Sequence, residues 1–437
     1  MLNFIDYNRQ HKTLKGEKMK LTKISLATLV ALGAFSSVAS ATPLEEAIKN
    51  VDLSGFARYR YTHTHEYKKS QDNVSKENGT NDGDGHNFKM IANFKAAIDD
   101  NFFGVIGLRY NATDGSGDNA GTANTDVTDT TNTTDPFKVH QFYLGYKAGN
   151  TTITAGKQEI GSYFTDDAIG TGIRVVNEDI EGLTLTALAF DAIEGNDDES
   201  DGDLYKITSY LSSYDVGNLY AAGIAGSYDP INFQLWYASL TNLADLLAAD
   251  VSANFAINDD ISLGGRINYV NSTADKEAKK HIYSSHGDKY NDGNFYAGEL
   301  SASLFGLDLS AGYIGWKVQD KGVTSFSFED QGSLIDAGED VFDWTLTEGK
   351  GNFFYATSAY TFDKFTVGLD YVKGNIKTAG ANNQDTKEKI EEFVPRFAYQ
   401  YNKKLTFSSF YSFQTHKLPN DEKTKEDKFR FEAKYSF

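Results

Sequence analysis

Alternation of apolar and polar side chains at every second residue is the feature that most constrains how this chain folds. From Val51 onward, stretches of about ten residues alternate in this way and are separated by turns or polar loops. The apolar face of the last stretch consists mainly of aromatic residues, namely Phe429, Phe431, Ala433, Tyr435 and Phe437. A period of two places successive side chains on opposite faces of a β-strand. The sequence therefore predicts an all-β protein whose strands have one apolar face.

The number of alternating stretches and the connections between them define the architecture further. We predict 18 strands, at 51–63, 87–99, 102–113, 137–148, 151–157, 172–178, 182–190, 217–228, 231–240, 246–257, 260–270, 293–304, 307–318, 351–362, 365–376, 389–401, 404–415 and 427–437. Tight turns, such as 149–150 and 363–364, alternate in strict rotation with long acidic or glycine-rich loops. Short turns at one end and long loops at the other are typical of a transmembrane β-barrel.

A membrane also explains why the apolar signal is weak. In hydrocarbon every backbone N–H and C=O needs an internal partner, so a sheet can span only if it closes, and only alternate side chains meet lipid. The mean hydropathy of -0.46 with 14% aromatic residues agrees with this. The alternative is a secreted β-sandwich or propeller, but the chain has no repeated blade motif. We therefore predict an 18-stranded antiparallel transmembrane β-barrel. Pro395, inside a predicted strand, is expected at a bulge or a strand end.

Composition excludes several classes of function. The sequence has no cysteine, which excludes disulfide bonds and thiolate metal sites. Its net charge of -19 disfavours nucleic-acid binding, because the phosphate backbone requires basic partners. The sequence contains no phosphate-binding loop, zinc-binding helix motif or nucleophile elbow. We predict that the protein is not an enzyme.

The first part of the chain has the features of an export signal. Basic residues precede a short apolar stretch, 26–38, and small residues follow it. The stretch is shorter than the roughly 20 apolar residues that a spanning helix needs, so cleavage after Ala41 is expected. We interpret the chain as translated upstream sequence at 1–18, a signal peptide at 19–41 and an exported barrel at 42–437. The alternative for 1–18 is a long basic region of the signal itself.

Several short motifs of the exported chain resemble one family. They are RYRY at 58–61, AGKQ at 155–158, TDDAI at 165–169, GLTL at 182–185, GNLY at 217–220 and EDQG at 329–332. In content and order they resemble the major outer membrane porin of Campylobacter and its relatives. The resemblance implies a homotrimeric general-diffusion porin of the bacterial outer membrane, with extracellular long loops and with lipid and lipopolysaccharide around it. It also implies that a barrel-assembly machinery reads the terminal aromatic strand, with Phe437, Tyr435 and Phe429 as the assembly signal.

A barrel of 18 strands is wide enough for an aqueous channel, so selectivity depends on what narrows it. The third long loop, 158–171, contains Glu159, Asp166 and Asp167. The resemblance implies that this loop folds inward and forms the constriction.

Basic residues at the alternate, polar positions of the strands are predicted to point into the channel and to face that loop. They are Arg58, Arg60, Lys89, Lys95, Arg109 and Arg174, with Arg266 and Arg396 as further members. A basic wall opposite an acidic loop would create a transverse field that orders water and biases which ions pass. The alternative is that these side chains only solvate the wall or pair with Asp370, Glu299 and Glu392.

Acidic residues in the long loops suggest two further properties. Six carboxylates lie between Glu194 and Asp203, and a negative vestibule favours mild cation selectivity. Calcium takes oxygen ligands from several loops. The resemblance implies an ion where the inward loop meets the next loop, so Asp166, Asp167 and Asp203 are candidate ligands at the constriction. Against this, the chain is shorter near Ile169 than the family pattern, so a ligand present in relatives is missing here. No cofactor is required for the predicted function.

Other functions remain as alternatives to a general porin. A substrate-specific channel would carry a binding site in its lumen and show saturable flux. A surface adhesin or antigen would use long loops such as 112–135, rich in Thr, Asp, Asn and Gly, to bind other cells. Such polar loops are equally expected as a hydrated shield.

Overall fold

The computed structural model describes residues 51–69, 81–116, 136–165, 167–193, 214–286, 289–325, 334–342, 348–379, 385–419 and 423–437. The predicted upstream segment and signal peptide lie outside these residues, and so do Asp166, Asp203 and most of 112–135. Within the described part, no helix has the length and apolar character needed to cross a membrane.

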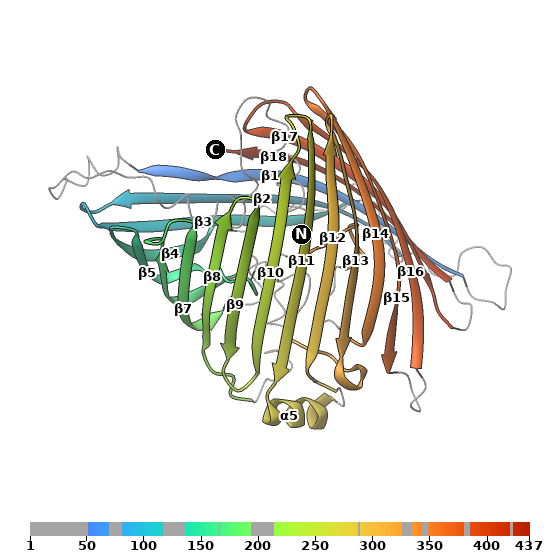
Figure 1. Cartoon of the computed structure of the whole chain (residues 1–437), viewed down its shortest axis with the longest axis horizontal. Coiled ribbons are helices and arrows are strands. Elements are labelled where there is room, and N and C mark those ends of the chain that lie inside the picture. The colour runs from blue at the N-terminus through green and yellow to red at the C-terminus, as the bar shows by residue number, and fades with distance from the viewer. Residues whose placement is uncertain are drawn as a thin grey trace.

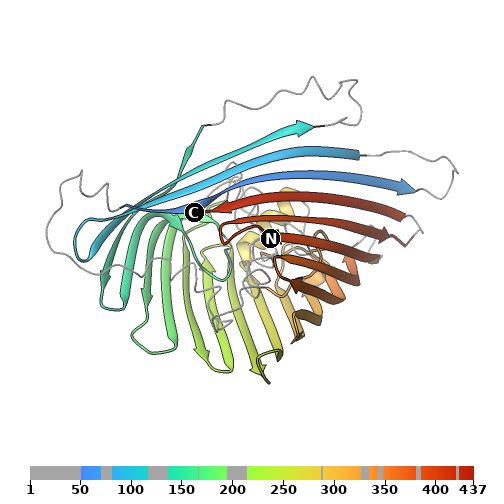
Figure 2. The same ribbon diagram turned by 90° about the horizontal axis from the view of Figure 1, so that it is seen from above.

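Eighteen antiparallel strands form one closed sheet, as predicted (Figures 1 and 2). They are β1 (Asp52–Lys69), β2 (Asn81–Ala97), β3 (Phe102–Ser116), β4 (Lys138–Ala148), β5 (Thr151–Glu159), β6 (Ile169–Asn177), β7 (Leu183–Ile193), β8 (Leu219–Tyr228), β9 (Ile231–Leu240), β10 (Ala244–Ala256), β11 (Ile261–Ala274), β12 (Gly293–Leu304), β13 (Leu307–Val318), β14 (Lys350–Phe362), β15 (Phe365–Ala379), β16 (Asp385–Gln400), β17 (Leu405–Lys417) and β18 (Lys423–Ser436). Each strand pairs with its neighbours in sequence, and β18 pairs with β1. The sheet therefore has no free edge, which satisfies the backbone in a membrane.

Strand length differs from the prediction mainly at the long-loop end. β1 continues to Lys69 and β2 begins at Asn81, although their apolar alternation ends well before these residues. The two strands stay paired residue by residue as far as Glu66 and Asn81. Backbone pairing therefore extends the sheet beyond the segment whose side chains meet lipid, and side-chain alternation does not report this extension.

The predicted strict rotation of turns and loops is wrong at one connection. β9 and β10 meet at the long-loop end through a tight turn at 241–243. Asn242 has a positive φ of 65°, and the Leu243 N–H donates to the Leu240 carbonyl. Asparagine tolerates the left-handed region better than most residues, which explains how so short a connection closes.

Pro395 lies in the middle of β16, so the expectation of a bulge or strand end is wrong. It faces Leu369 of β15, whereas pairing with β17 stops at Phe393 and resumes at Arg396. The register is the same on both sides of this gap. The missing N–H of proline is therefore accommodated by a local interruption of one ladder.

Burial separates the two faces of the sheet. Large apolar side chains on one face are exposed, including Ile267, Leu300 and Phe354. Their neighbours on the other face are buried, and many of these are polar. In β7, Thr184 and Thr186 are buried and point inward. The exposed apolar face is the one that contacts lipid, and the opposite face lines the interior.

An apolar cluster occupies the interior beside β7 to β16. Trp316 stacks on Phe353 with ring centroids 5.5 Å apart, and Phe342 packs edge-on against both rings. The Trp316 indole N–H donates to the Glu348 carbonyl at 2.8 Å. The helix α5 (Lys276–His286) adds Ala278 to the same cluster. Beside these strands, loop, helix and strand side chains therefore pack against one another inside the barrel.

Asp275 caps α5 at the long-loop end of the barrel. Its Oδ1 accepts the backbone N–H groups of Glu277 at 2.8 Å and Ala278 at 3.2 Å. Burial raises the pKa of Asp275, but these N–H groups outweigh burial and hold the pKa of this carboxyl below its usual value. The cap stabilises the start of a helix that covers the apolar cluster.

Candidate pore constriction

A row of basic side chains crosses four neighbouring strands on the inner face. Lys434 of β18 faces Arg58 of β1, and Arg58 faces Lys89 of β2. Arg109 of β3 continues the basic surface, and Arg58, Lys89 and Arg109 are all buried. The Arg58 guanidinium donates to Asn87 Oδ1 at 2.8 Å. We call these four cations the basic row. Lys434 was not among the predicted basic residues, although its alternation with the aromatic residues of the last strand places it on the inner face.

Two of the predicted basic residues have strong local partners. Arg60 binds the Glu432 carboxylate, with Nη2 2.8 Å and Nε 3.1 Å from Oε2. The Lys95 ammonium lies 4.3 Å from the centre of the Phe103 ring, which is cation–π geometry. Lys95 lies near the turn end of β2, far along the strand from Lys89. These contacts agree with the alternative that some predicted basic residues only line the wall.

Arg174 connects the wall to the start of the third long loop. Its Nη1 donates to the carbonyl of Glu159 at 3.3 Å. A Cβ at Gly161, where φ is +68°, would lie 2.4 Å from the same nitrogen, so the guanidinium fits only against glycine. The structure thus brings Arg174 and Glu159 together, whereas Asp167 is exposed and Asp166 lies outside the described residues.

The described part of the third loop is apolar and well packed. Ile160, Tyr163 and Phe164 are almost fully buried and belong to the same cluster as residues of β7 to β16. Burial raises the pKa of Tyr163, and its hydroxyl is close enough to Asp250 and Arg266 to sense their charges. Packing therefore positions this segment by apolar side chains that the sequence analysis, which followed the acidic residues, did not use.

Inward-facing carboxylates lie on β10 to β16, where β10 is opposite β1 in the order of the 18 strands and β16 is two strands from β18. Asp250 of β10 binds Arg266 of β11 through two hydrogen bonds of 3.1 and 2.6 Å. Glu299 of β12 accepts the hydroxyl of Tyr355 at 2.8 Å. Asp370 and Glu392, on β15 and β16, are also buried. We call this set of carboxylates the acidic wall, and Arg266 and Arg396 pair with its members rather than joining the basic row.

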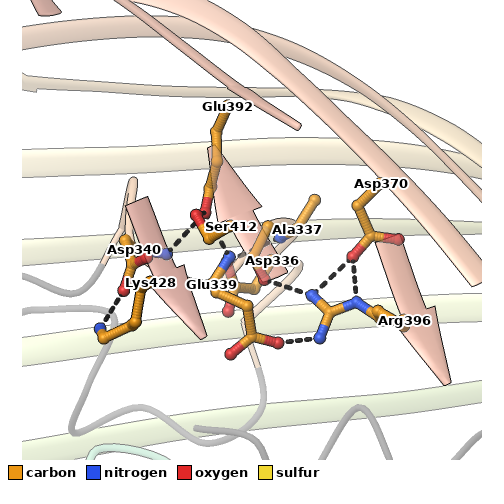
Figure 3. A network of polar contacts seen from close by, with 10 residues as sticks. Asp336, Ala337, Glu339, Asp340, Asp370, Glu392, Arg396, Ser412 and Lys428 are labelled. Carbon is orange, nitrogen blue, oxygen red and sulfur yellow. Dashed lines mark hydrogen bonds and ion pairs between the residues drawn. The ribbon is translucent and has the colours of Figure 1, made fainter. Parts of the chain in front are cut away.

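Part of the seventh long loop, residues 334–342, is attached to this acidic wall, and Figure 3 shows the contacts. We call this segment the strap. Arg396 of β16 binds Asp370 at 2.8 Å, donates to the Gly338 carbonyl at 2.8 Å and forms an ion pair with Glu339. Asp340 forms an ion pair with Lys428 of β18.

Glu392 anchors the backbone of the strap. Its Oε1 accepts the N–H groups of Glu339 and Asp340, each at 3.0 Å, and the hydroxyl of Ser412 at 2.7 Å. Gly338 has a φ of +83°, and a Cβ there would lie 2.1 Å from Glu392 Oε2. Only glycine therefore allows this close approach.

The strap was not predicted, although the sequence of this loop contains a signal for it. Leu334, Ile335 and Phe342 are apolar residues in a long connection between two strands, and all are buried. The Ile335 N–H also donates to Asn268 of β11 at 2.6 Å. Apolar residues inside an otherwise polar loop indicate a segment that packs onto the protein.

A possible calcium site was predicted at Asp166, Asp167 and Asp203, of which only Asp167 is described. In the described ranges, no group of three or more His, Cys, Asp or Glu side chains has an arrangement suited to a metal ion. The fit of calcium to the predicted set therefore stays a prediction.

Comparison with known proteins establishes the family. The model of the Campylobacter major outer membrane protein family matches residues 19–437. The chain belongs to this family. It is therefore an integral outer-membrane porin and a channel for solutes, with no enzymatic role, as the resemblance implied. No curated protein is significantly similar to it in sequence.

Solved structures share the fold of this porin at low sequence identity. Pseudomonas aeruginosa OccK9 (OpdG) has a TM-score of 0.64 at 14% identity, with 88% of this chain and 99% of that chain covered. P. aeruginosa OccK2 (OpdF), solved in complex with glucuronate, has a TM-score of 0.61 at 13% identity, covering 88% and 97%. A BenF-like porin from Pseudomonas fluorescens Pf-5 has a TM-score of 0.59 at 15% identity, covering 88% and 99%. At these identities the likeness concerns the fold alone.

Proposed function

We propose that this porin is a general-diffusion channel for ions and small hydrophilic solutes, with mild cation preference. The observation that carries the proposal is the uneven distribution of charge around the interior. The basic row lies on β18, β1, β2 and β3, and the carboxylates Asp250, Glu299, Asp370 and Glu392 lie on β10 to β16. Opposed charges on a channel wall create a field that polar solutes and water tolerate better than apolar solutes do. The net charge of -19 supports the preference for cations.

The proposal includes a constriction formed by the third loop. Burial of Ile160, Tyr163 and Phe164 in the interior cluster supports an inward position for this loop. The contact between Arg174 and Glu159 supports a fixed distance between the loop and the β6 wall. Arg58, Lys89 and Arg109 would then face the loop across the narrowest part of the channel, with Glu159, Asp166 and Asp167 on the loop side.

Substrate-selective uptake of anionic solutes is the second candidate. The basic row supports it, because three cations on adjacent strands could bind successive carboxylates of a solute. OccK2, which shares the fold, was solved with glucuronate, a carboxylate sugar. The two functions differ in one measurable property, since a general channel does not saturate and a selective channel does.

The test is single-channel recording of the purified porin in planar bilayers under a salt gradient. We expect ohmic openings in groups of three, as a homotrimer would give, a mild cation preference that high salt reduces, and no saturation with uncharged sugars. A calcium chelator would change the conductance if the predicted calcium ion is bound. Saturable current block by glucuronate would replace general diffusion with the selective function. A folded barrel that does not conduct would favour the adhesin alternative.

Charge reversal in the basic row tests the constriction itself. In the Arg58→Glu and Arg109→Glu variants, we expect the reversal potential to shift toward stronger cation preference, because each change removes a cation and adds an anion at the narrow zone. The Lys350→Glu variant has the same change of charge on the lipid-facing side of β14 and is the matched control. Equal reversal potentials in the wild type and both variants would remove these arginines from the constriction.

A further inference from the structure

A row of lysines follows the long-loop end of the barrel from β13 to β18. In the paired strands, Lys317 faces Lys350, Lys350 faces Lys377, and Lys377 faces Lys387. Farther along, Lys389 faces Lys417. We call the row the lysine rim, and its members are Lys317, Lys350, Lys377, Lys387, Lys389, Lys417 and Lys425. Because adjacent strands are about 4.8 Å apart, the rim brings positive charges together over a continuous stretch of sheet.

The lysine rim faces the membrane side of the wall. In five strands an aromatic residue lies four positions from a rim lysine, toward the middle of the barrel, and therefore on the same face. The pairs are Lys317 with Tyr313, Lys350 with Phe354, Lys389 with Phe393, Lys417 with Phe413, and Lys425 with Phe429. Phe354, Phe393 and Phe413 are exposed on the outer face. Four residues span roughly 13 Å of strand, which places the ammonium groups above the lipid-facing aromatic belt, at the level of the outer-leaflet headgroups.

The rim concentrates like charges in a way that the sheet itself does not favour. Like charges directly opposite each other on one face destabilise a pair of strands. Two acidic residues of the same outer face are engaged by lysines outside the rim: Glu391 lies 3.5 Å from Lys373, and Asp385 pairs with Lys321. Glu391 also attracts Lys417, a member of the rim, so it offsets part of the charge of the rim lysines. An external anion at this level would offset the repulsion among the rim lysines.

We propose that the lysine rim binds the phosphate groups of outer-leaflet lipopolysaccharide. The acyl chains of such a molecule would lie against the aromatic belt, and its phosphates would lie among the ammonium groups. A second copy of the chain docking through its own rim is disfavoured, because two such rows repel each other. The proposal depends on the outer-membrane location of the porin and is independent of which solutes pass through it.

The experiment measures binding of purified lipopolysaccharide to the full-length porin in detergent. The test variant carries Lys350→Glu, Lys377→Glu and Lys417→Glu. The matched control carries Lys364→Glu, Lys403→Glu and Lys404→Glu, which are exposed lysines at the short-turn end. We expect the test variant to bind about a hundredfold more weakly, given the usual contribution of a surface lysine next to an anionic membrane, and the control to bind like wild type. Heat-modifiable migration and unchanged conductance would show that each barrel is folded.

Two further binding measurements test whether the phosphate groups are recognised and whether they must belong to lipopolysaccharide. Phosphatase-treated lipopolysaccharide should bind the wild type as weakly as intact lipopolysaccharide binds the test variant. Inorganic phosphate at the same concentration should compete poorly, because it lacks acyl chains. If the charge-reversed variant does not fold, the Lys→Gln triple at the same positions replaces it. Wild-type affinity in the folded triple variant, or equal binding of the dephosphorylated lipid, would overturn the proposal.

Discussion

Replacing Arg396 with methionine is expected to release the strap and widen the channel. Arg396 binds Asp370 and Glu339 and donates to the Gly338 carbonyl, so its loss leaves two buried carboxylates without their shared cation. Removing one partner of a buried ion pair typically costs about 3 to 5 kcal/mol. We expect the free energy of unfolding in urea to fall by about 3 kcal/mol, at the lower end of that range. We also expect single-channel conductance to rise because the strap no longer stays on the wall.

A loop variant separates these two effects. Glu339→Gln with Asp340→Asn removes the strap charges that pair with Arg396 and Lys428 but leaves the wall intact. Conductance should rise in this variant as well, with a smaller loss of stability, because the Asp370 pair with Arg396 remains. If both variants conduct like the wild type, the strap does not narrow the channel.

Deleting Phe437 is expected to impair assembly of the barrel severely. The Phe437 N–H donates to the Gly55 carbonyl at 3.1 Å, and its ring packs 6.0 Å from the ring of Tyr435. Both contacts lie at the seam where β18 closes the sheet against β1, and we infer that the assembly machinery reads this strand. We expect at least a tenfold lower yield of heat-modifiable barrel in outer membranes, corresponding to about 1.4 kcal/mol in an equilibrium between assembled and unassembled chain.

Refolding in detergent distinguishes recognition from stability. Purified chain lacking Phe437 should refold almost as well as wild type if its defect lies in recognition by the assembly machinery. Phe437→Tyr keeps an aromatic ring and the backbone N–H, and it should assemble normally in cells. Normal yield of the deleted chain in outer membranes would contradict the role of Phe437, Tyr435 and Phe429 as an assembly signal.

The fold of this porin could be predicted from sequence because lipid imposes a simple rule. Side chains such as Ile267 and Leu300 must be apolar on one face, and the alternation they create is visible without any structure. The ends of β1 and β2 could not be predicted, since backbone pairing continues there without alternation. The prediction for Pro395 was wrong because the sequence does not show that pairing with β17 can be interrupted at the proline and resume in the same register.

The candidate constriction was only partly predictable for a different reason. The alternation of side chains along each strand identifies which charged residues point inward, and it placed Arg58, Lys89 and Arg109 on the inner face. It does not show which of them meet across the interior. The pairing of Arg396 with Asp370 and Glu339 depends on where a distant loop is attached, and this is a tertiary contact between residues 57 positions apart in sequence for Glu339. The prediction relied on the acidic residues of the loops, whereas their buried apolar residues determine where the loops lie in the barrel.

The apolar cluster beside β7 to β16 divides the cross-section of the barrel into unequal sectors. Among the described residues, its strand members come from β7 to β16, and the basic row belongs to the remaining strands. Natural variation in the two sectors should therefore follow different rules. Substitutions in the packed sector, such as at Trp316 or Phe353, would be tolerated only where the barrel still folds in good yield. Substitutions around Arg58 would be selected by their effect on the passage of solutes, as the proposed function implies.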